Sequence, residues 1–105
     1  MAAQFDIARN LNRESRVAYP FLLILQSDQI DSLHSVIVAP LVLAAAGRVG
    51  KSRLHPLLEV SGQSYVVKME DLASAPRAMI GSVVGSALPD RYRIVAAFDL
   101  LFTGV

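Results

Sequence analysis

Short runs of alternating apolar and polar residues fill most of this chain, and a period of two predicts strands rather than helices. Residues 4–8 alternate in this way, and residues 18–26 place large apolar side chains on both faces, which is typical of a strand that is buried on both sides. Residues 35–39 form a third apolar run, which Pro40 should end because proline cannot donate to a strand ladder. We therefore expect three strands before Pro40.

The middle of the chain carries a hairpin signal. The dipeptide Ser61-Gly62 lies between two runs that favour strands, and such a pair is typical of a tight turn. Residues 41–46 are compatible with a strand or a helical turn, and residues 47–53, with two glycines and three basic side chains, predict a loop. We expect strands at 57–60 and 63–69, a connection at 69–76 with a helical turn at 70–73, and a last strand at 78–84 that Gly81 and Gly85 interrupt.

A change of period near the C-terminal end predicts one helix. Pro89 suits the first turn, where its missing N–H needs no partner, and Gly104 suits the left-handed residue that ends a helix. Between them, apolar residues recur at spacings of four and three, which places Ile94, Phe98 and Leu101 on one face of the helix. A second, mixed face carries Tyr92, Val95 or Ala96, Asp99 and Phe102. The whole pattern predicts a mainly β protein with a C-terminal α-helix: a small curled antiparallel sheet of five or six strands, with the helix packed on it.

Composition and charge narrow the class of protein. A length of 105 residues favours one domain over residues 1–105. Hydrophobic residues make up 53% of the chain, and the mean hydropathy is +0.45, so one small domain has apolar surface to hide and a homodimer is expected. A net charge of +1 does not favour binding along a phosphate backbone. No apolar run reaches the ~18 residues of a membrane span and no signal pattern is present, so we expect a cytoplasmic protein.

Candidate catalytic and metal-binding groups are few. The chain has no Cys, and its two histidines, His34 and His55, have no neighbouring ligand at helical spacing, so we expect no metal and no cofactor. Asp28 and Asp31 stand three residues apart, which suits either an acid–base pair or the organisation of a turn. Because they fall in a connection between two expected strands, we favour the second interpretation.

A compact charged segment, Arg13-Glu14-Ser15-Arg16, is the remaining candidate. Two guanidinium groups and a hydroxyl are what a metal-free ribonuclease could use to hold the scissile phosphate of an RNA. The same residues could form a solvated loop, or a loop that grips a protein partner. Composition leaves these three interpretations open.

The order and spacing of several short motifs resemble the CcdB family of toxins. The matching segments are Arg13-Glu14-Ser15-Arg16, Gln26-Ser27-Asp28 with Ile30-Asp31, Val38-Ala39-Pro40-Leu41, His55-Pro56, Leu72-Ala73-Ser74-Ala75-Pro76 with Ile80-Gly81, and the final Gly104-Val105. None of these motifs is specific alone, but together they cover nearly the whole chain. The resemblance implies an SH3-like curled antiparallel sheet or barrel, the fold that CcdB and MazF toxins share, with a C-terminal helix and pairing as a homodimer.

The resemblance also implies a function without catalysis. CcdB toxins poison DNA gyrase by binding its A subunit and trapping the cleaved gyrase–DNA complex, and a CcdA-type antitoxin neutralises them. Toxin and antitoxin together repress their operon, so operator DNA is contacted only through the antitoxin complex. The alternatives are a MazF-like endoribonuclease toxin, which has the same fold, and a CcdB homologue with weakened toxicity.

Functional residues can be carried over by position within this resemblance. The gyrase-binding residues implied are Phe102, Thr103, Gly104 and Val105. Thr103 stands where the best-known members have Trp, a side chain that often anchors binding interfaces, although Phe102 can supply aromatic area. The antitoxin-binding residues implied are Arg13, Glu14, Ser15 and Arg16.

Overall fold

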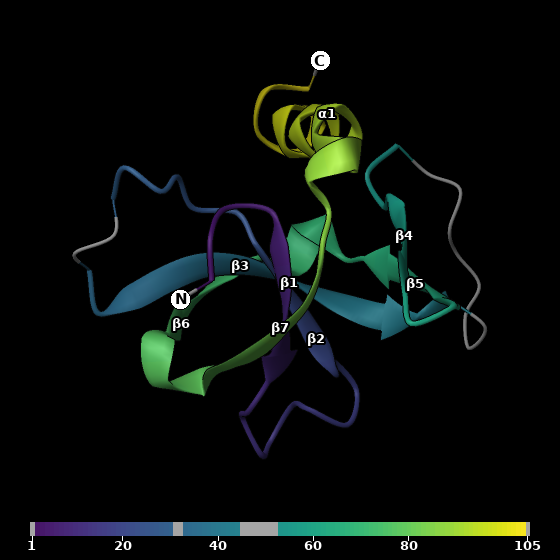
Figure 1. Cartoon of the computed structure of the whole chain (residues 1–105). Helices are drawn as coiled ribbons and strands as arrows, with labels where there is room; N and C mark the ends of the chain where they lie inside the picture. Colours follow the sequence, from purple (N-terminus) through teal and green to yellow (C-terminus); the bar gives the residue numbers. More distant parts are fainter. Residues whose placement is uncertain (1, 31–32, 45–52, 105) are drawn as a thin grey trace.

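The computed structural model describes residues 2–30, 33–44 and 53–104. Its strands are β1 (Asp6–Asn10), β2 (Phe21–Ile24), β3 (Ser35–Leu43), β4 (Leu57–Val60), β5 (Gln63–Val67), β6 (Ala73–Pro76) and β7 (Ile80–Ser86). Short 3-10 helices, η2 (Met69–Asp71), η3 (Arg77–Met79) and η4 (Leu88–Asp90), connect the later elements, and α1 spans Arg91–Thr103 (Figure 1). No described helix is long and apolar enough to cross a membrane.

The described strands form one strongly curled antiparallel sheet. Their hydrogen-bonded order is β4-β5-β3-β2-β1-β7, and β6 also pairs with β3. β1 and β7 lie far apart in the sequence but pair side by side, with Ile7 opposite Gly85. Because β6, η3 and β7 follow one another, they carry the chain from β3 back to β1 and close a small barrel (Figure 1). The curled sheet with a C-terminal helix confirms the predicted fold class.

Alternation in β2 and β3 divides the apolar side chains between two cores. Leu22, Leu23 and Ile24 are all buried, which confirms that β2 is covered on both faces. The larger core, which α1 covers, includes Ile7, Leu23, Ala39, Leu41, Tyr65, Val67, Met69, Ile94 and Ala97. The smaller core, inside the barrel, consists of Leu22, Ile24, Val36 and Val38. Fully burying one such aliphatic side chain contributes about 1.5–3 kcal/mol, so both cores matter for stability.

The face of α1 that carries Ile94, Phe98 and Leu101 is only partly buried. Ile94 and Ala97 are buried and Leu101 is half-buried, whereas Phe98 is 38% exposed. The small side chain of Ala97 lets the helix approach the sheet closely, and the neighbouring Phe98 is then turned to the edge of the contact. The three residues that the sequence places on one face are therefore buried to different degrees.

The C-terminal end of α1 lies where the sequence predicted it, but the N-terminal end does not. Pro89 lies in the preceding 3-10 helix η4, so α1 itself begins two residues later, at Arg91. Gly104 ends the helix with φ of +79°, and its N–H donates to the carbonyl of Leu100 at 3.1 Å. This left-handed residue is the one predicted from the sequence.

Strand β3 continues through Pro40, so the prediction that this proline ends the strand is wrong. The N–H of Leu25 donates to the carbonyl of Ile37, and the alternation of an antiparallel ladder then turns the nitrogen of Pro40 away from β2. On that other edge β6 pairs as far as Val38 and β5 pairs from Leu41 onward. Pro40 lies between the two partners, where no ladder needs its missing N–H.

The hairpin prediction is confirmed, whereas β1 and β2 have boundaries that differ from the predicted ones. Ser61 and Gly62 both have left-handed φ values, +54° and +82°, as a type I′ turn between β4 and β5 requires. β1 begins two residues later than predicted, because Phe5, with φ of +69°, turns the chain just before it. β2 is confined to the four central residues of the predicted run.

The segment predicted as a connection at 69–76 contains a strand. Its helical turn lies at Met69–Asp71, slightly earlier than predicted, and Ala73–Pro76 forms β6 against β3. Glycine does not interrupt β7, which runs through both Gly81 and Gly85. The ambiguous run at 41–46 continues β3 as far as Leu43, and its last two residues, like most of the predicted loop at 47–53, lie outside the described residues.

The two glycines of β7 have different surroundings and should respond differently to substitution. A Cβ at Gly81 would lie 2.9 Å from Leu11 Cδ2, 3.0 Å from Arg9 Cβ and 3.1 Å from the Arg9 carbonyl oxygen, whereas a Cβ at Gly85 would meet nothing within 4 Å. We expect Gly81→Ala to lower the free energy of unfolding by about 1–2 kcal/mol and Gly85→Ala to change it by less than about 0.5 kcal/mol. Urea denaturation measures both values, and equal effects would contradict the close approach of β1 and β7.

Candidate functional site

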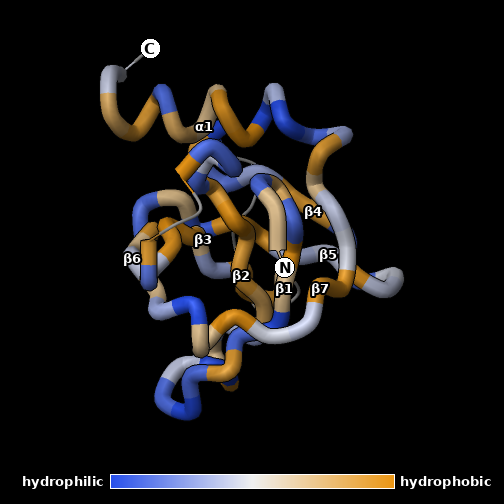
Figure 2. The backbone as a smooth tube through the Cα atoms, turned by 60° about the vertical axis from the view of Figure 1, so that its left-hand side comes forward, coloured by the Kyte–Doolittle hydropathy of each residue, from blue (hydrophilic) through white to orange (hydrophobic). Residues whose placement is uncertain are grey.

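The exposed end of α1 presents an aromatic pair. The ring centroids of Phe98 and Phe102 are 4.7 Å apart, and Phe102 is 59% exposed. Residues four apart on a helix share one face, so both rings belong to the same surface. Figure 2 shows hydrophobic positions recurring along α1 out to this end. Large exposed apolar side chains grouped in this way are typical of a surface that binds a partner.

The residues after Phe102 are held by backbone geometry rather than by packing. Thr103 is exposed, and its hydroxyl donates to the carbonyl of Asp99 at 2.7 Å. Gly104 is exposed as well, and its left-handed conformation would strain any other residue. Val105 lies outside the described residues. Of the four residues implied to bind gyrase, the structure therefore places three, together and exposed, at the end of α1.

A shallow apolar cavity continues this surface onto the N-terminal segment. Its volume is about 160 Å³, and it opens between α1 and the residues before β1. The residues that line it are Gln4, Phe5, Leu25, Ile94, Val95 and Phe98. The aromatic pair thus has an apolar groove along its side, and a partner that contacts the rings can also fill the groove.

The β1–β2 loop, residues 11–20, is built around Asn10. This is the only buried polar side chain in the described part of the chain, with 6% exposed. Its Nδ2 donates to Ser15 Oγ at 3.0 Å and to the carbonyl of Tyr19 at 2.9 Å, and its Oδ1 accepts from the N–H of Asn12 at 3.0 Å. Asn10 was not among the residues predicted from the sequence. The sequence signal for this turn was the Asn-x-Asn spacing, because an Asn side chain often accepts a hydrogen bond from the backbone N–H two residues later.

The four residues implied to bind an antitoxin lie in this loop but do not act as one group. Arg13, Glu14 and Arg16 are exposed, and neither guanidinium forms a hydrogen bond or ion pair with the described residues. Ser15 is half-buried, and its hydroxyl is turned inward to Asn10. The two guanidinium groups and the hydroxyl therefore do not converge as a phosphate clamp would require.

A groove of about 250 Å³ separates this loop from β6. Its lining residues are Asn10, Asn12, Ser15, Tyr19, Leu22, Val38, Pro40, Asp71, Ala73, Ser74, Ala75, Pro76 and Met79. The hydroxyl of Tyr19 donates to Asp71 Oδ2 at 3.3 Å, and burial together with the nearby Asp71 carboxylate raises the pKa of Tyr19. Asp71 is the only charged residue in this lining, and its negative charge disfavours a nucleic-acid phosphate in the groove.

The two candidate regions lie at opposite ends of the molecule. Figure 1 shows α1 at the top of the view and the loop between β1 and β2 at the bottom. One copy of the chain therefore does not bring Phe102 and Arg13 together. Each region has to be considered as a separate binding surface.

The remaining polar candidates have structural roles. His55 Nε2 lies 2.7 Å from Glu70 Oε1, and Lys68 Nζ lies 3.4 Å from Glu70 Oε2, so the entry to β4 is tied to η2. Burial acts to raise the pKa of Glu70, but hydrogen bonds from its own backbone and from His55 outweigh it, and the pKa falls below the ordinary value. His34 is exposed. Within the described residues, no group of three or more His, Cys, Asp or Glu could hold a metal ion.

Asp28 holds the segment before β1 in place. Its Oδ1 accepts the N–H of Gln4 at 2.7 Å, which fixes the segment before β1 against the end of β2. This bond supports the structural interpretation that we favoured. Asp31 lies outside the described residues.

Comparison with known proteins gives a family and a fold. A family model described as the CcdB protein matches residues 4–104. Among solved structures, the Mycobacterium tuberculosis toxin MazF-mt6 superposes with a TM-score of 0.75 at 20% identity, covering 92% of this chain and 95% of that chain. An endoribonuclease in complex with its cognate antitoxin from Mycobacterial species gives 0.74 at 14% identity, covering 94% and 92%. At these identities the solved structures establish the shared fold alone.

Proposed function

The chain belongs to the CcdB family of toxins of toxin–antitoxin systems, and from that premise we propose that it poisons DNA gyrase by binding rather than by catalysis. It acts in the cytoplasm, where it binds the gyrase A subunit and holds the enzyme in its cleaved complex with DNA. No cofactor and no metal take part.

The observation that carries this proposal is the exposed aromatic end of α1. Phe102 is 59% exposed and stacks on Phe98, so its ring is available to a partner and is already ordered. Ordered aromatic side chains dominate many interfaces because they bury a large area at a small cost in entropy. The contact residues that we propose are Phe102, Thr103, Gly104 and Val105.

The antitoxin surface that we propose is the β1–β2 loop. Arg13 and Arg16 are exposed there on a backbone that Asn10 holds in place, and exposed guanidinium groups suit the carboxylates of an extended acidic segment. A CcdA-type antitoxin binds Arg13, Glu14, Ser15 and Arg16 and neutralises the toxin. The pair represses its operon, and the toxin reaches operator DNA only through the antitoxin, in keeping with a net charge of +1.

The test of the proposed function is a cleavage assay with purified components. Gyrase, supercoiled plasmid and ATP are incubated with the protein and then treated with denaturant and protease, and linear DNA should accumulate with toxin dose. In parallel the protein is incubated with RNA, which should stay intact. RNA cleavage without linear DNA would show the MazF-like endoribonuclease instead, and neither product would show a homologue with weakened toxicity.

The protein should also be a homodimer, because η4 and α1 leave several large apolar side chains in water. Tyr92 is 75% exposed, Val95 45% and Leu88 49%, in addition to the aromatic pair. A second copy would cover part of this surface. Sedimentation equilibrium at micromolar concentration should give twice the chain mass of 11.3 kDa, and the mass of a single chain would contradict the prediction.

A further inference from the structure

Two adjoining cavities open at one mouth of the barrel, at the end away from the β1–β2 loop. Their volumes are about 180 and 210 Å³. They share Ala2, Ile24, Val36 and Arg77 as lining residues. These volumes are below the ~300 Å³ that is usual for drug-sized ligands, so an occupant has to be small.

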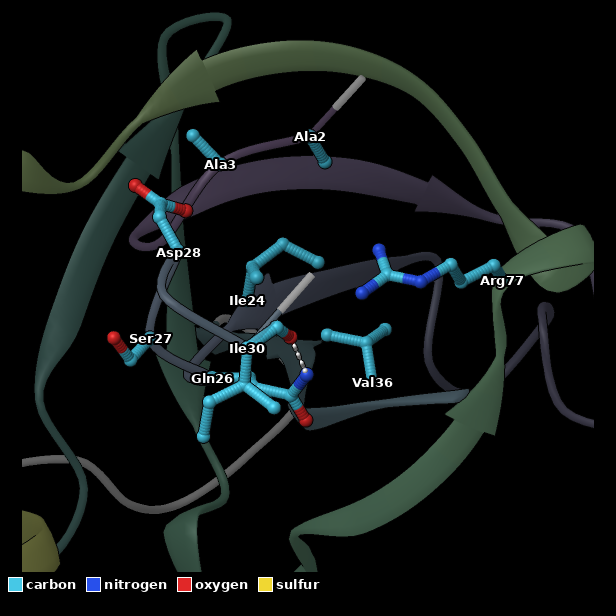
Figure 3. A pocket seen from close by; sticks show the side chains of 9 residues that line it. All are labelled: Ala2, Ala3, Ile24, Gln26, Ser27, Asp28, Ile30, Val36 and Arg77. Atoms are coloured by element: carbon cyan, nitrogen blue, oxygen red, sulfur yellow. Dashed lines mark hydrogen bonds between the residues drawn. The ribbon is translucent and has the colours of Figure 1, made fainter. Parts of the chain in front are cut away.

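Arg77 places an oriented cation in this space. Its Nε donates to the carbonyl of Leu33 at 2.6 Å, and its backbone N–H donates to the carbonyl of His34 at 2.9 Å. Figure 3 shows the guanidinium group reaching into the pocket, with its two terminal nitrogens directed toward the interior. Within the described residues these two nitrogens have no acceptor. Because Nε is already bonded, binding an anion end-on costs little further side-chain entropy.

The surface beside the guanidinium group is apolar. Ile24 and Val36 are 2% and 4% exposed and form the floor, and Ala2 and Ile80 contribute further apolar area. Two parallel N–H donors match the two oxygens of a carboxylate, and an aliphatic tail can lie on the floor. The pocket therefore combines one site for a negative charge with one site for a short hydrocarbon chain.

Asp28 limits the charge of the ligand. Figure 3 shows its carboxylate on the side of the pocket opposite Arg77, with Ile24 between them. The N–H of Gln4 donates to Asp28 Oδ1 at 2.7 Å and so holds this carboxylate in the lining of the pocket. Asp28 repels a ligand with two negative charges about twice as strongly as one with a single charge, so the pocket favours a carboxylate over a phosphate monoester.

We propose that this pocket binds an aliphatic carboxylate, with the two terminal nitrogens of Arg77 holding the carboxylate and Ile24 and Val36 holding the tail. The ligand is either a free short-chain acid or the C-terminal carboxylate of a peptide that ends in an aliphatic residue. The site lies on the sheet face opposite α1, so it does not depend on the proposed gyrase contact.

The proposal is tested by titrating the intact protein and following the methyl resonances of Ile24 and Val36. Hexanoate should produce saturable shifts with a dissociation constant below about 10 mM, and hexanamide and hexyl phosphate should bind at least about tenfold more weakly. A peptide ending in Gly-Gly-Val as the free acid, compared with its amide, tests the second source of the carboxylate. The tighter of the two acids identifies the source. If neither acid binds, or if hexanamide binds as well as hexanoate, the proposal is overturned.

Substitutions locate the site. Arg77→Gln should weaken hexanoate binding about tenfold or more, because it removes the charged fork. Arg91→Gln removes the same charge at the exposed start of α1 and should leave binding unchanged. Ala2→Phe should fill the pocket and abolish binding even if Arg77→Gln does not fold. Wild-type affinity in either folded pocket variant would overturn the proposal.

Discussion

Replacing Phe102 by aspartate should raise the dose needed for gyrase poisoning roughly thirtyfold or more while the protein remains folded. The ring is 59% exposed, so its main intramolecular contact is the stack on Phe98, worth about 0.5–1.5 kcal/mol. Against a partner the new carboxylate would be buried without a counter-charge, at a cost of about 2 kcal/mol or more, which is roughly a thirtyfold loss of affinity. The measurements are linear DNA in the gyrase assay and a thermal melt of the same preparation.

A matched control and a reverse substitution sharpen this test. Val17→Asp places the same charge on an apolar side chain that is 91% exposed in the β1–β2 loop, at the other end of the molecule, and should keep most of the poisoning activity. Thr103→Trp restores the aromatic residue of the best-known family members and should lower the dose needed for cleavage. Val105→Glu should behave like the Phe102 variant. Full activity of both charged variants, Phe102→Asp and Val105→Glu, would show that the end of α1 is not the functional surface.

Replacing Asn10 by alanine should lower the free energy of unfolding by about 2–4 kcal/mol, the largest stability effect that we predict. The side chain is 6% exposed and forms three hydrogen bonds, and its loss leaves the carbonyl of Tyr19 and the N–H of Asn12 without that partner. Each buried group left unsatisfied costs about 1–3 kcal/mol. Urea denaturation of the variant against the wild type gives the value.

The same substitution separates the two proposed binding surfaces. Without Asn10, the β1–β2 loop loses the hydrogen bonds that order it. Antitoxin binding, measured by calorimetry, should therefore weaken even under conditions in which the variant is fully folded. The gyrase contact that we propose on α1 lies at the other end of the molecule and should be unaffected. Asn12→Ala is the control, because it removes one exposed bond to the N–H of Glu14. Equal losses of stability in the two variants would contradict the central role of Asn10.

Sequence patterns correctly predicted those elements whose structure depends mainly on residues that are neighbours in the sequence. The two-sided burial of β2, the turn at Ser61-Gly62 and the end of α1 at Gly104 each follow from the residues themselves. β6 could not be predicted, because Ala-Ser-Ala-Pro has little strand preference and becomes a strand only by pairing with β3. The burial of Ala97 in place of Phe98 is also a tertiary effect, since both lie on nearby faces of one helix and only the distance to the sheet decides between them.

The candidate binding surfaces, like the fold, were predicted only in part from the sequence. The exposure of Phe102, Thr103 and Gly104 agrees with a role in binding, and that role stays a prediction. The arginines of the loop are exposed as a partner-binding loop requires, but Ser15 is turned inward. The pocket at Arg77 was not predicted. It forms because β6 and η3 position the Arg77 side chain beside residues distant in the sequence, and no sequence motif indicates this arrangement.

The pairing of β1 with β7 has a consequence for a chain that is still being synthesised. Ile7 pairs with Gly85, so β1 emerges from the ribosome long before its second partner exists. Until β7 follows, β1 is an open edge and the inside of the barrel is exposed to water, because a loop of that length is costly to close without the final contacts. α1 comes after β7 in the chain. The surface that we propose for gyrase is thus translated only after β7, the strand that closes the barrel.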